Sequence, residues 1–167
     1  CAPVIDREEL LSSFVRDLDR AEWVAVDTEA DSLHAYPEKL CLMQLSIPGD
    51  DVLVDPLAGM EMAEFFSSLG DKTLIMHGAD YDVRLFKMGC GFVPKSIFDT
   101  MLAARLLGRR QFGLSHLTKE ILGVELEKTS QKANWAKRPL TDKMSEYALN
   151  DTRHLQPLAA ALKTELE

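Results

Sequence analysis

Two acidic residues separated by one position, Asp27 and Glu29, have the spacing of a metal-ligand pair. They end the apolar segment 23–26, which is typical of a buried β-strand. In a strand, residues i and i+2 face the same side, so both carboxylates project together. Two ionised carboxylates this close repel each other, and a hard divalent cation such as Mg²⁺ or Mn²⁺ supplies the missing countercharge. The pair indicates a divalent-cation site, although acidic residues also end many strands where the chain leaves the core.

Two further groups of acidic and aromatic residues lie later in the chain. His77 and Asp82 belong to a segment directly after the apolar strand 73–76, where the helix dipole alone already favours acidic residues. Tyr147 and Asp151 are four residues apart and share one face of the last helix. Tyr147 falls within that helix's apolar pattern, so a core tyrosine is the alternative. Asp151 follows the same face towards the interior, where an unpaired carboxylate is costly, and this favours a ligand role.

The elements that must position these residues are those of an α/β domain. We expect strands at 23–27, 40–47, 51–54, 73–76 and 96–98, with helices at 6–18, 60–69, 80–88, 99–107, 114–122 and from 141 onwards. The short turn 48–50 predicts an antiparallel hairpin, whereas the later strand–helix–strand order predicts parallel pairing. We therefore predict a mixed five-stranded sheet, antiparallel at one edge, parallel at the other and flanked by helices. Asp6, Asp99 and Thr141 are the expected helix caps.

The charge is unevenly distributed. The 167 residues carry a net charge of −8, which argues against binding nucleic acid through overall charge. Residues 108–143 nevertheless contain eight basic and four acidic residues. A basic band beside an acidic remainder suits a protein that holds both a polyanion and metal cations, and a solvated surface is the alternative.

These motifs together resemble the 3′–5′ exonuclease domain of the ribonuclease D group, in the tyrosine subclass of the DEDD superfamily. The first motif matches Asp27-Thr28-Glu29, the second matches HGADYDVRLF with Asp82 at the metal-binding place, and the third matches Tyr147 through Asp151. The histidine-bearing sister group has His five residues before the last Asp, where this chain has Glu146. Supporting matches are the segments LCLMQLS, FDTMLAARLL and WAKRPL.

The resemblance implies a ribonuclease H-like fold and two-metal phosphodiester hydrolysis. By this analogy Asp27 bridges two Mg²⁺ or Mn²⁺ ions, Glu29 and Asp151 complete the first site, and Asp82 serves the second. Tyr147 orients the attacking water. A free tyrosine has a pKa near 10, so positioning is its main expected role.

Substrate contacts are predicted less directly. Lys137 and Arg138 in the basic band are the expected phosphate contacts, with Lys132 behind them. Trp135 has two readings, stacking on a base or anchoring its loop, and we favour the anchor. The last two candidates are His77, as a contact to the terminal nucleotide, and Gln44, which either bonds substrate or satisfies backbone.

The predicted function is removal of nucleoside 5′-monophosphates from single-stranded 3′ ends, with RNA favoured over DNA. The alternatives are a DNA exonuclease of the same subclass and a noncatalytic nucleic-acid-binding module. We expect one exonuclease domain over residues 1–167, without the helical accessory domains of ribonuclease D proper. The three cysteines form no CxxC pair and no apolar run is long enough to span a membrane, so a reducing, cytoplasmic location is expected.

Overall fold

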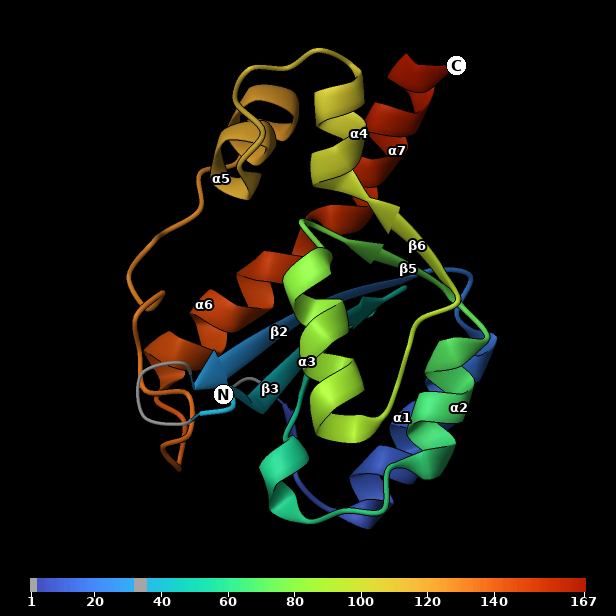
Figure 1. The fold of residues 1–167 in the computed structure, drawn as a ribbon, viewed down its shortest axis with the longest axis vertical. Helices are drawn as coiled ribbons and strands as arrows, with labels where there is room; N and C mark the ends of the chain where they lie inside the picture. Colours follow the sequence, from blue (N-terminus) through green and yellow to red (C-terminus); the bar gives the residue numbers. More distant parts are fainter. Residues whose placement is uncertain (1–2, 32–35) are drawn as a thin grey trace.

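A mixed sheet of six strands lies at the centre of the computed structural model, which describes residues 3–31 and 36–167 (Figure 1). The strands are β1 (Val4–Ile5), β2 (Val24–Asp31), β3 (Lys39–Ile47), β4 (Asp50–Val54), β5 (Thr73–Met76) and β6 (Ser96–Asp99). The helices are α1 (Glu8–Arg20), α2 (Ala63–Gly70), α3 (Asp80–Cys90), α4 (Thr100–Leu106), α5 (Leu114–Leu117), α6 (Asp142–Arg153) and α7 (Leu155–Leu166). A 3₁₀ turn, η1 (Pro56–Ala58), and a π-helical turn, η2 (Thr118–Leu122), complete the described elements.

The strand order is β1-β4-β3-β2-β5-β6. β2, β3 and β4 pair antiparallel, whereas β2, β5 and β6 pair parallel, which confirms the predicted mixed sheet. The hairpin between β3 and β4 turns at Pro48 and Gly49, where Gly49 has a φ of 82° that favours glycine. The predicted count of five strands was wrong. The sixth, β1, pairs parallel with β4 over only two residues, too few for an alternating pattern to show.

Helices cover both faces of the sheet. On one face, α1, α2 and α3 pack against the sheet around buried Leu18, Phe65 and Phe86. On the other face, α4, α5 and α7 form a second core, and α6 with the loop before it forms a third. Alternation along β2 places Val24 and Val26 in the first core and Ala25 in the second. The even positions therefore face α3, and the odd positions face α6 and α7.

Two predicted helix ends differ from the structure. Helix α1 begins at Glu8 after Arg7, and no side chain caps it, so Asp6 is not its cap. The final helix is broken at His154 into α6 and α7. Pro157 explains the break, because it has no N–H to donate to the carbonyl of Arg153 four residues earlier. The caps predicted at Asp99 and Thr141 are confirmed, each accepting hydrogen bonds from backbone amides of the helix that it precedes.

Within residues 3–31 and 36–167, no helix combines the length and apolar character needed to cross a membrane. Cys41 is buried and Cys90 is exposed, and both are free thiols. Cys1 lies outside the described residues.

Truncating Phe86 is expected to destabilise the fold strongly. Its ring is fully buried and makes edge contacts with Phe66 and Phe92. Phe86→Ala should lower the free energy of unfolding by about 3–5 kcal/mol, because it removes buried area and leaves a cavity. Urea unfolding monitored by circular dichroism measures this. Leu106→Ala is the control, since Leu106 is 72% exposed and its truncation should cost at most about 0.5 kcal/mol.

Candidate active site

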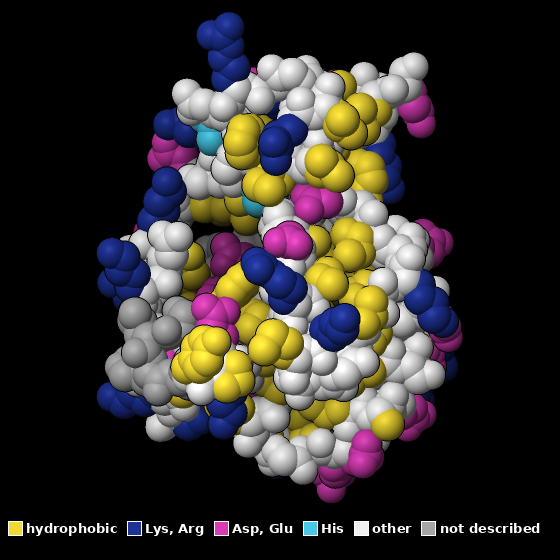
Figure 2. Space-filling view, viewed as in Figure 1, with side chains coloured by type: hydrophobic (Ala, Val, Ile, Leu, Met, Phe, Trp, Pro, Cys, Tyr) yellow, Lys and Arg dark blue, Asp and Glu magenta, His cyan; other side chains and the backbone are white. Residues whose placement is uncertain are grey.

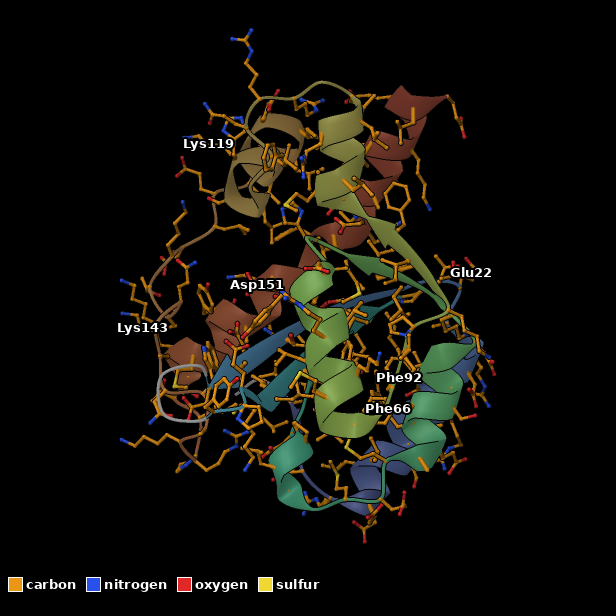
Figure 3. The ribbon with its side chains drawn as sticks, in the orientation of Figure 1. Glu22, Phe66, Phe92, Lys119, Lys143 and Asp151 are labelled. Atoms are coloured by element: carbon orange, nitrogen blue, oxygen red, sulfur yellow. The ribbon has the colours of Figure 1, made fainter. Side chains whose placement is uncertain are left out.

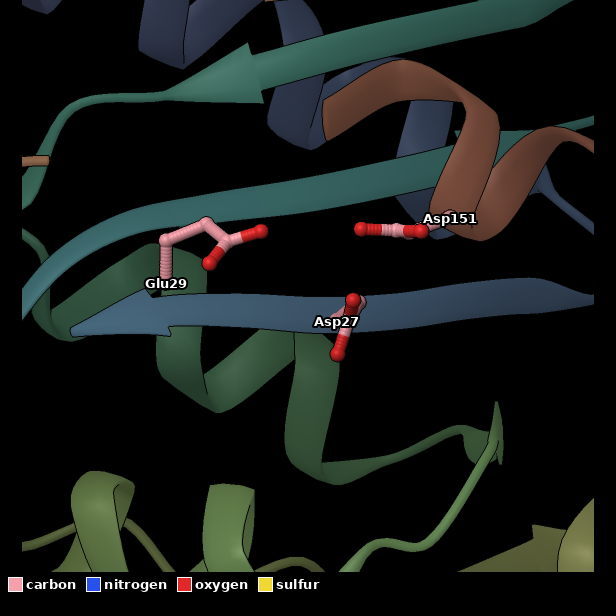
Figure 4. Close-up of side chains that lie close together, drawn as sticks. All are labelled: Asp27, Glu29 and Asp151. Atoms are coloured by element: carbon pink, nitrogen blue, oxygen red, sulfur yellow. The ribbon is translucent and has the colours of Figure 1, made fainter. Parts of the chain in front are cut away.

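Three carboxylates meet on the face of β2 that looks towards α6. Asp27 and Glu29 project from β2, Asp151 comes from α6, and one oxygen of each lies within 4.8 Å of the others (Figure 4). The strand continues past both acids to Asp31, with a bulge against β3 between Glu29 and Ala30. The predicted pair therefore lies inside a central strand rather than at its end. Strand β3 pairs with β2 at both acids, whereas the pairing with β5 ends at Ala25.

Helix α6 brings Asp151 to this place because its neighbours are bonded to the sheet. Ser46 on β3 donates its hydroxyl to the Thr152 hydroxyl at 2.8 Å, and both side chains are buried. The Arg153 guanidinium donates to Asp51 on β4 at 3.2 Å. Thr152 and Arg153 directly follow Asp151 in the chain. Their bonds to β3 and β4 therefore fix the position of the Asp151 carboxylate. The predicted helical placement of Tyr147 and Asp151 is confirmed.

Asp82 reaches the same site from the opposite face of the sheet. It lies in the first turn of α3, is 5% exposed and accepts a hydrogen bond from the hydroxyl of Thr28. Thr28 points towards α3 because it alternates with Asp27 and Glu29 on β2. The turn before α3 is fixed by Asp99, whose carboxylate accepts the Gly78 and Ala79 amides at 2.9 Å each.

Burial, together with the close approach of these acids, raises their pKa values. Burial, followed by the charges of Asp82, Asp151 and Glu29, raises the pKa of Asp27 well above its ordinary value. Burial and the Asp151 carboxylate raise the pKa of Glu29 to about 8. Burial raises the pKa of Asp151 to about 7. The four acids therefore resist being ionised together unless a positive charge joins them.

Tyr147 lies half-buried beside the acidic group. Burial, together with the charges of Asp151, Glu29 and Asp27, raises its pKa, so its phenol keeps its proton at neutral pH. The ring of Trp135 packs against it, with 6.1 Å between ring centroids and a tilt of 32°. Trp135 is only 2% exposed, which supports our reading of it as a loop anchor.

Gln44 and His77 are both held within the protein. Gln44 is fully buried and donates its amide to Glu29 at 3.2 Å, so it orients a candidate ligand. His77 places Nδ1 2.8 Å from the Thr100 hydroxyl, which itself donates to the Met76 carbonyl. Because that hydroxyl proton is used, His77 Nδ1 is the donor, and burial lowers the pKa of this histidine.

The two basic residues of the WAKRPL segment differ. Lys137 is exposed, as a phosphate contact requires. The guanidinium of Arg138 is bonded within the protein: it pairs with Asp55 and donates to three backbone carbonyls. A phosphate at Arg138 would have to displace one of these bonds.

A cavity of about 420 Å³ adjoins the acidic group. Thr28, Glu29, Tyr81 and the loop segment 131–135 are among its lining residues. On the outer surface, Figure 2 shows a hollow with acidic side chains inside it and Lys and Arg side chains along one side. Figure 3 shows Asp151 directed inwards, with Lys119 and Lys143 on the neighbouring edge of the molecule.

Three residues of this site were missed by sequence reasoning. Thr28 lies between two predicted ligands, and the sequence assigns it no role. Ser46 belongs to the matched segment LCLMQLS, but nothing in the sequence pairs it with Thr152. Asp55 follows the predicted strand 51–54, and its partner Arg138 is 83 residues away. No local signal is common to the three: Thr28 lies between two acids, Ser46 lies inside an apolar segment, and Asp55 lies at the end of one.

Comparison with known proteins agrees with this geometry. The family model described as "3′-5′ exonuclease" matches residues 3–167. The chain belongs to this 3′–5′ exonuclease family. A Zymomonas mobilis protein named ribonuclease D is 32% identical to it over 169 aligned positions, covering 98% of this chain and 43% of the relative. The exosome complex component 10 of Rattus norvegicus is 35% identical, covering 99% of this chain and 19% of the relative.

The fold of this exonuclease-family chain matches a solved ribonuclease D. The crystal structure of Escherichia coli RNase D, described as an exoribonuclease involved in structured RNA processing, superimposes with a TM-score of 0.93 at 29% identity. The match covers 99% of this chain and 45% of that one. The predicted ribonuclease H-like fold is thereby confirmed. The chain spans less than half the length of each of these three proteins.

The donor set fits the divalent metal use that the family implies. The three grouped side chains offer only carboxylate oxygens, the ligands that hard divalent cations prefer. Their raised pKa values show a site short of positive charge. Asp27, Glu29 and Asp151 would hold the metal, with Asp82 next to Asp27 as a further ligand.

The stability of the metal-free protein should fall as pH rises. An acid with a raised folded-state pKa binds its proton more tightly in the folded protein. The stabilisation from such an acid is complete below its unfolded-state pKa near 4. It is lost as the pH rises through the folded-state pKa, which is about 8 for Glu29 and about 7 for Asp151. Each such group contributes a slope of up to about 1.4 kcal/mol per pH unit.

Urea unfolding in EDTA between pH 5 and 8 measures this slope. Asp151→Asn should flatten it and stabilise the protein at pH 8, whereas Asp71→Asn, which removes an exposed acid, should do neither. Equal slopes in wild type and Asp151→Asn would contradict the raised pKa assigned to Asp151.

Proposed function

We propose that the chain is a metal-dependent 3′–5′ exonuclease domain that removes nucleoside 5′-monophosphates from single-stranded nucleic acid, with RNA favoured. The observation that carries this proposal is the meeting of Asp27, Glu29 and Asp151 within 4.8 Å, with Asp82 held beside them by Thr28. The preference for RNA is supported by the names of the relatives, ribonuclease D among them. The proposed domain covers the whole chain, as the family match does over residues 3–167.

The four acids divide into two groups by position. Asp27 faces α6 but is close to both Asp151 and Asp82, so it is the residue proposed to hold both ions. Glu29 and Asp151 are the proposed partners on one side, and Asp82 on the other. When bound, two Mg²⁺ or Mn²⁺ ions lower the pKa of the attacking water and stabilise the leaving 3′ oxygen.

Tyr147 is proposed to orient the water through its phenol. Its raised pKa makes it a poor base, so it positions the water while other groups accept the proton. The exposed Lys137 and Lys132 are the proposed phosphate contacts, and Trp135 supports Tyr147 from behind. His77 remains a candidate contact to the terminal nucleotide. Because its Nε2 is buried, this contact would require the structure to open locally.

Two other functions remain to be tested. A DNA exonuclease would use the same acids, because they contact phosphate and water rather than the 2′-hydroxyl. A noncatalytic binding module would be expected to lose at least one acid, whereas all four are present here.

A cleavage time course separates these functions. Matched single-stranded RNA and DNA labelled at the 5′ end are incubated with Mg²⁺, Mn²⁺ or EDTA, with Asp27→Ala as the control for contaminating nuclease. We expect a ladder that shortens from the 3′ end, only with metal and only with wild type, and faster on RNA. Faster cleavage of DNA would favour the second function. Binding without cleavage by the folded protein would favour the third.

Replacing the phenol tests the role of Tyr147. Tyr147→Phe keeps the ring against Trp135 but removes the hydroxyl, so kcat should fall by about 10²-fold while KM changes little. Single-turnover kinetics on the preferred polymer measure both. A large rise in KM with unchanged kcat would show that Tyr147 binds substrate instead.

A further inference from the structure

All five N–H groups of the Arg138 guanidinium donate hydrogen bonds to other groups of the protein. Nε and Nη2 donate to the two carboxylate oxygens of Asp55 at 2.8 Å each. Nη1 donates to the carbonyls of Trp135 at 2.7 Å and Lys137 at 3.1 Å, and Nη2 also donates to the carbonyl of Cys41 at 2.6 Å. A guanidinium has five N–H groups, and five bonds are made.

Asp55 is a rigid partner for this arginine. It directly follows β4, is 6% exposed, and its amide donates to the Ile5 carbonyl of β1 at 2.9 Å. Burial opposes its ionisation, but hydrogen bonds from Arg138 and from the Leu57 amide outweigh burial and lower its pKa. The carboxylate is therefore fixed to the edge of the sheet and charged.

The loop that Arg138 fastens reaches the active site. This loop runs from η2 to α6 along the side of the molecule (Figure 1). Its residue Trp135, whose carbonyl Arg138 binds, packs its ring on Tyr147. Its segment 131–135 also forms a wall of the cavity beside Glu29.

We propose that Arg138 and Asp55 form a latch that positions Tyr147, and that Arg138 is a positioning residue rather than a phosphate contact. The latch holds the Trp135 backbone against β3 and β4, and the Trp135 ring then confines Tyr147 beside the acidic group. This proposal rests on the proposed exonuclease function and names two residues that set its turnover without touching substrate.

Asp55→Asn distinguishes the two roles by the sign of its effect. If Arg138 contacted phosphate, removing the competing carboxylate would free the guanidinium and add positive charge, so KM would fall. A latch predicts that kcat falls by about 10- to 100-fold, since a small displacement of a catalytic group costs this much, while KM changes less than about threefold.

Arg138→Lys keeps the charge but cannot make the bidentate pair, so it should lower kcat similarly. The double variant should be no slower than the worse single variant, because both changes break one latch. Asp71→Asn is the matched control: it removes an equal charge from an exposed ion pair with Lys95, and should change neither constant. Kinetics use the 167-residue chain, Mg²⁺ and a 5′-labelled single-stranded oligoribonucleotide.

The fluorescence of Trp135 reports the latch independently of activity. In a Trp23→Phe background Trp135 is the one remaining tryptophan, and its emission should shift to longer wavelength in Asp55→Asn and Arg138→Lys but not in Asp71→Asn. Urea unfolding of each variant shows that it remains folded. Where Asp55→Asn does not fold, Arg138→Lys carries the same comparison.

The possible outcomes separate the two proposals. A lower KM with unchanged kcat in Asp55→Asn, or unchanged kcat and emission in both single variants, would overturn the latch while leaving the exonuclease intact. A wild-type protein that cleaves neither polymer would overturn the exonuclease, and with it the catalytic part of the latch. A red-shifted emission with lowered kcat supports both.

Discussion

Mutual repulsion among closely spaced, partly buried carboxylates is the constraint on which the site depends. Asp27, Glu29 and Asp151 stay within 4.8 Å of one another although burial and like charge raise the pKa of each. Such a group persists only where the surrounding structure holds it. Three hydrogen bonds from two strands do so: Gln44 on β3 bonds Glu29, Ser46 on β3 bonds the neighbour of Asp151, and Thr28 on β2 bonds Asp82.

This arrangement explains why the two faces of β2 carry different residues. Odd positions supply the grouped acids Asp27 and Glu29 to the α6 side. The even position Thr28 reaches through to α3 and holds the fourth acid. The central strand thus collects ligands from helices on both sides of the sheet. The loop before α6 supports the site as well, because its Trp135 packs on Tyr147 and the Trp135 carbonyl accepts a hydrogen bond from Arg138.

Sequence patterns predicted the features that depend on residues close together in the chain. The strands that follow strong apolar segments, the Pro48–Gly49 turn and the caps at Asp99 and Thr141 are all local, and the structure has them. The motif residues Asp27, Glu29 and Asp151 converge because strand and helix periodicity already placed them on facing sides. β1 could not be predicted, since its two residues become a strand only by pairing with β4. The internal bonds of Arg138 could not be predicted, because its partner Asp55 is 83 residues away in the chain. Charge alone does not distinguish an arginine that faces solvent from one that is bonded within the protein.

Direct measurement of Mn²⁺ binding tests the central claim that the grouped acids form a divalent-cation site. Calorimetric titration of wild type and Asp27→Asn at pH 7, in two buffers of different ionisation enthalpy, gives both affinity and protons released. The account predicts that wild type binds Mn²⁺ and releases protons, because carboxylates with raised pKa values must lose them to become ligands. Asp27→Asn should lose both effects. Mn²⁺ binding of equal affinity and proton release in Asp27→Asn would contradict the account.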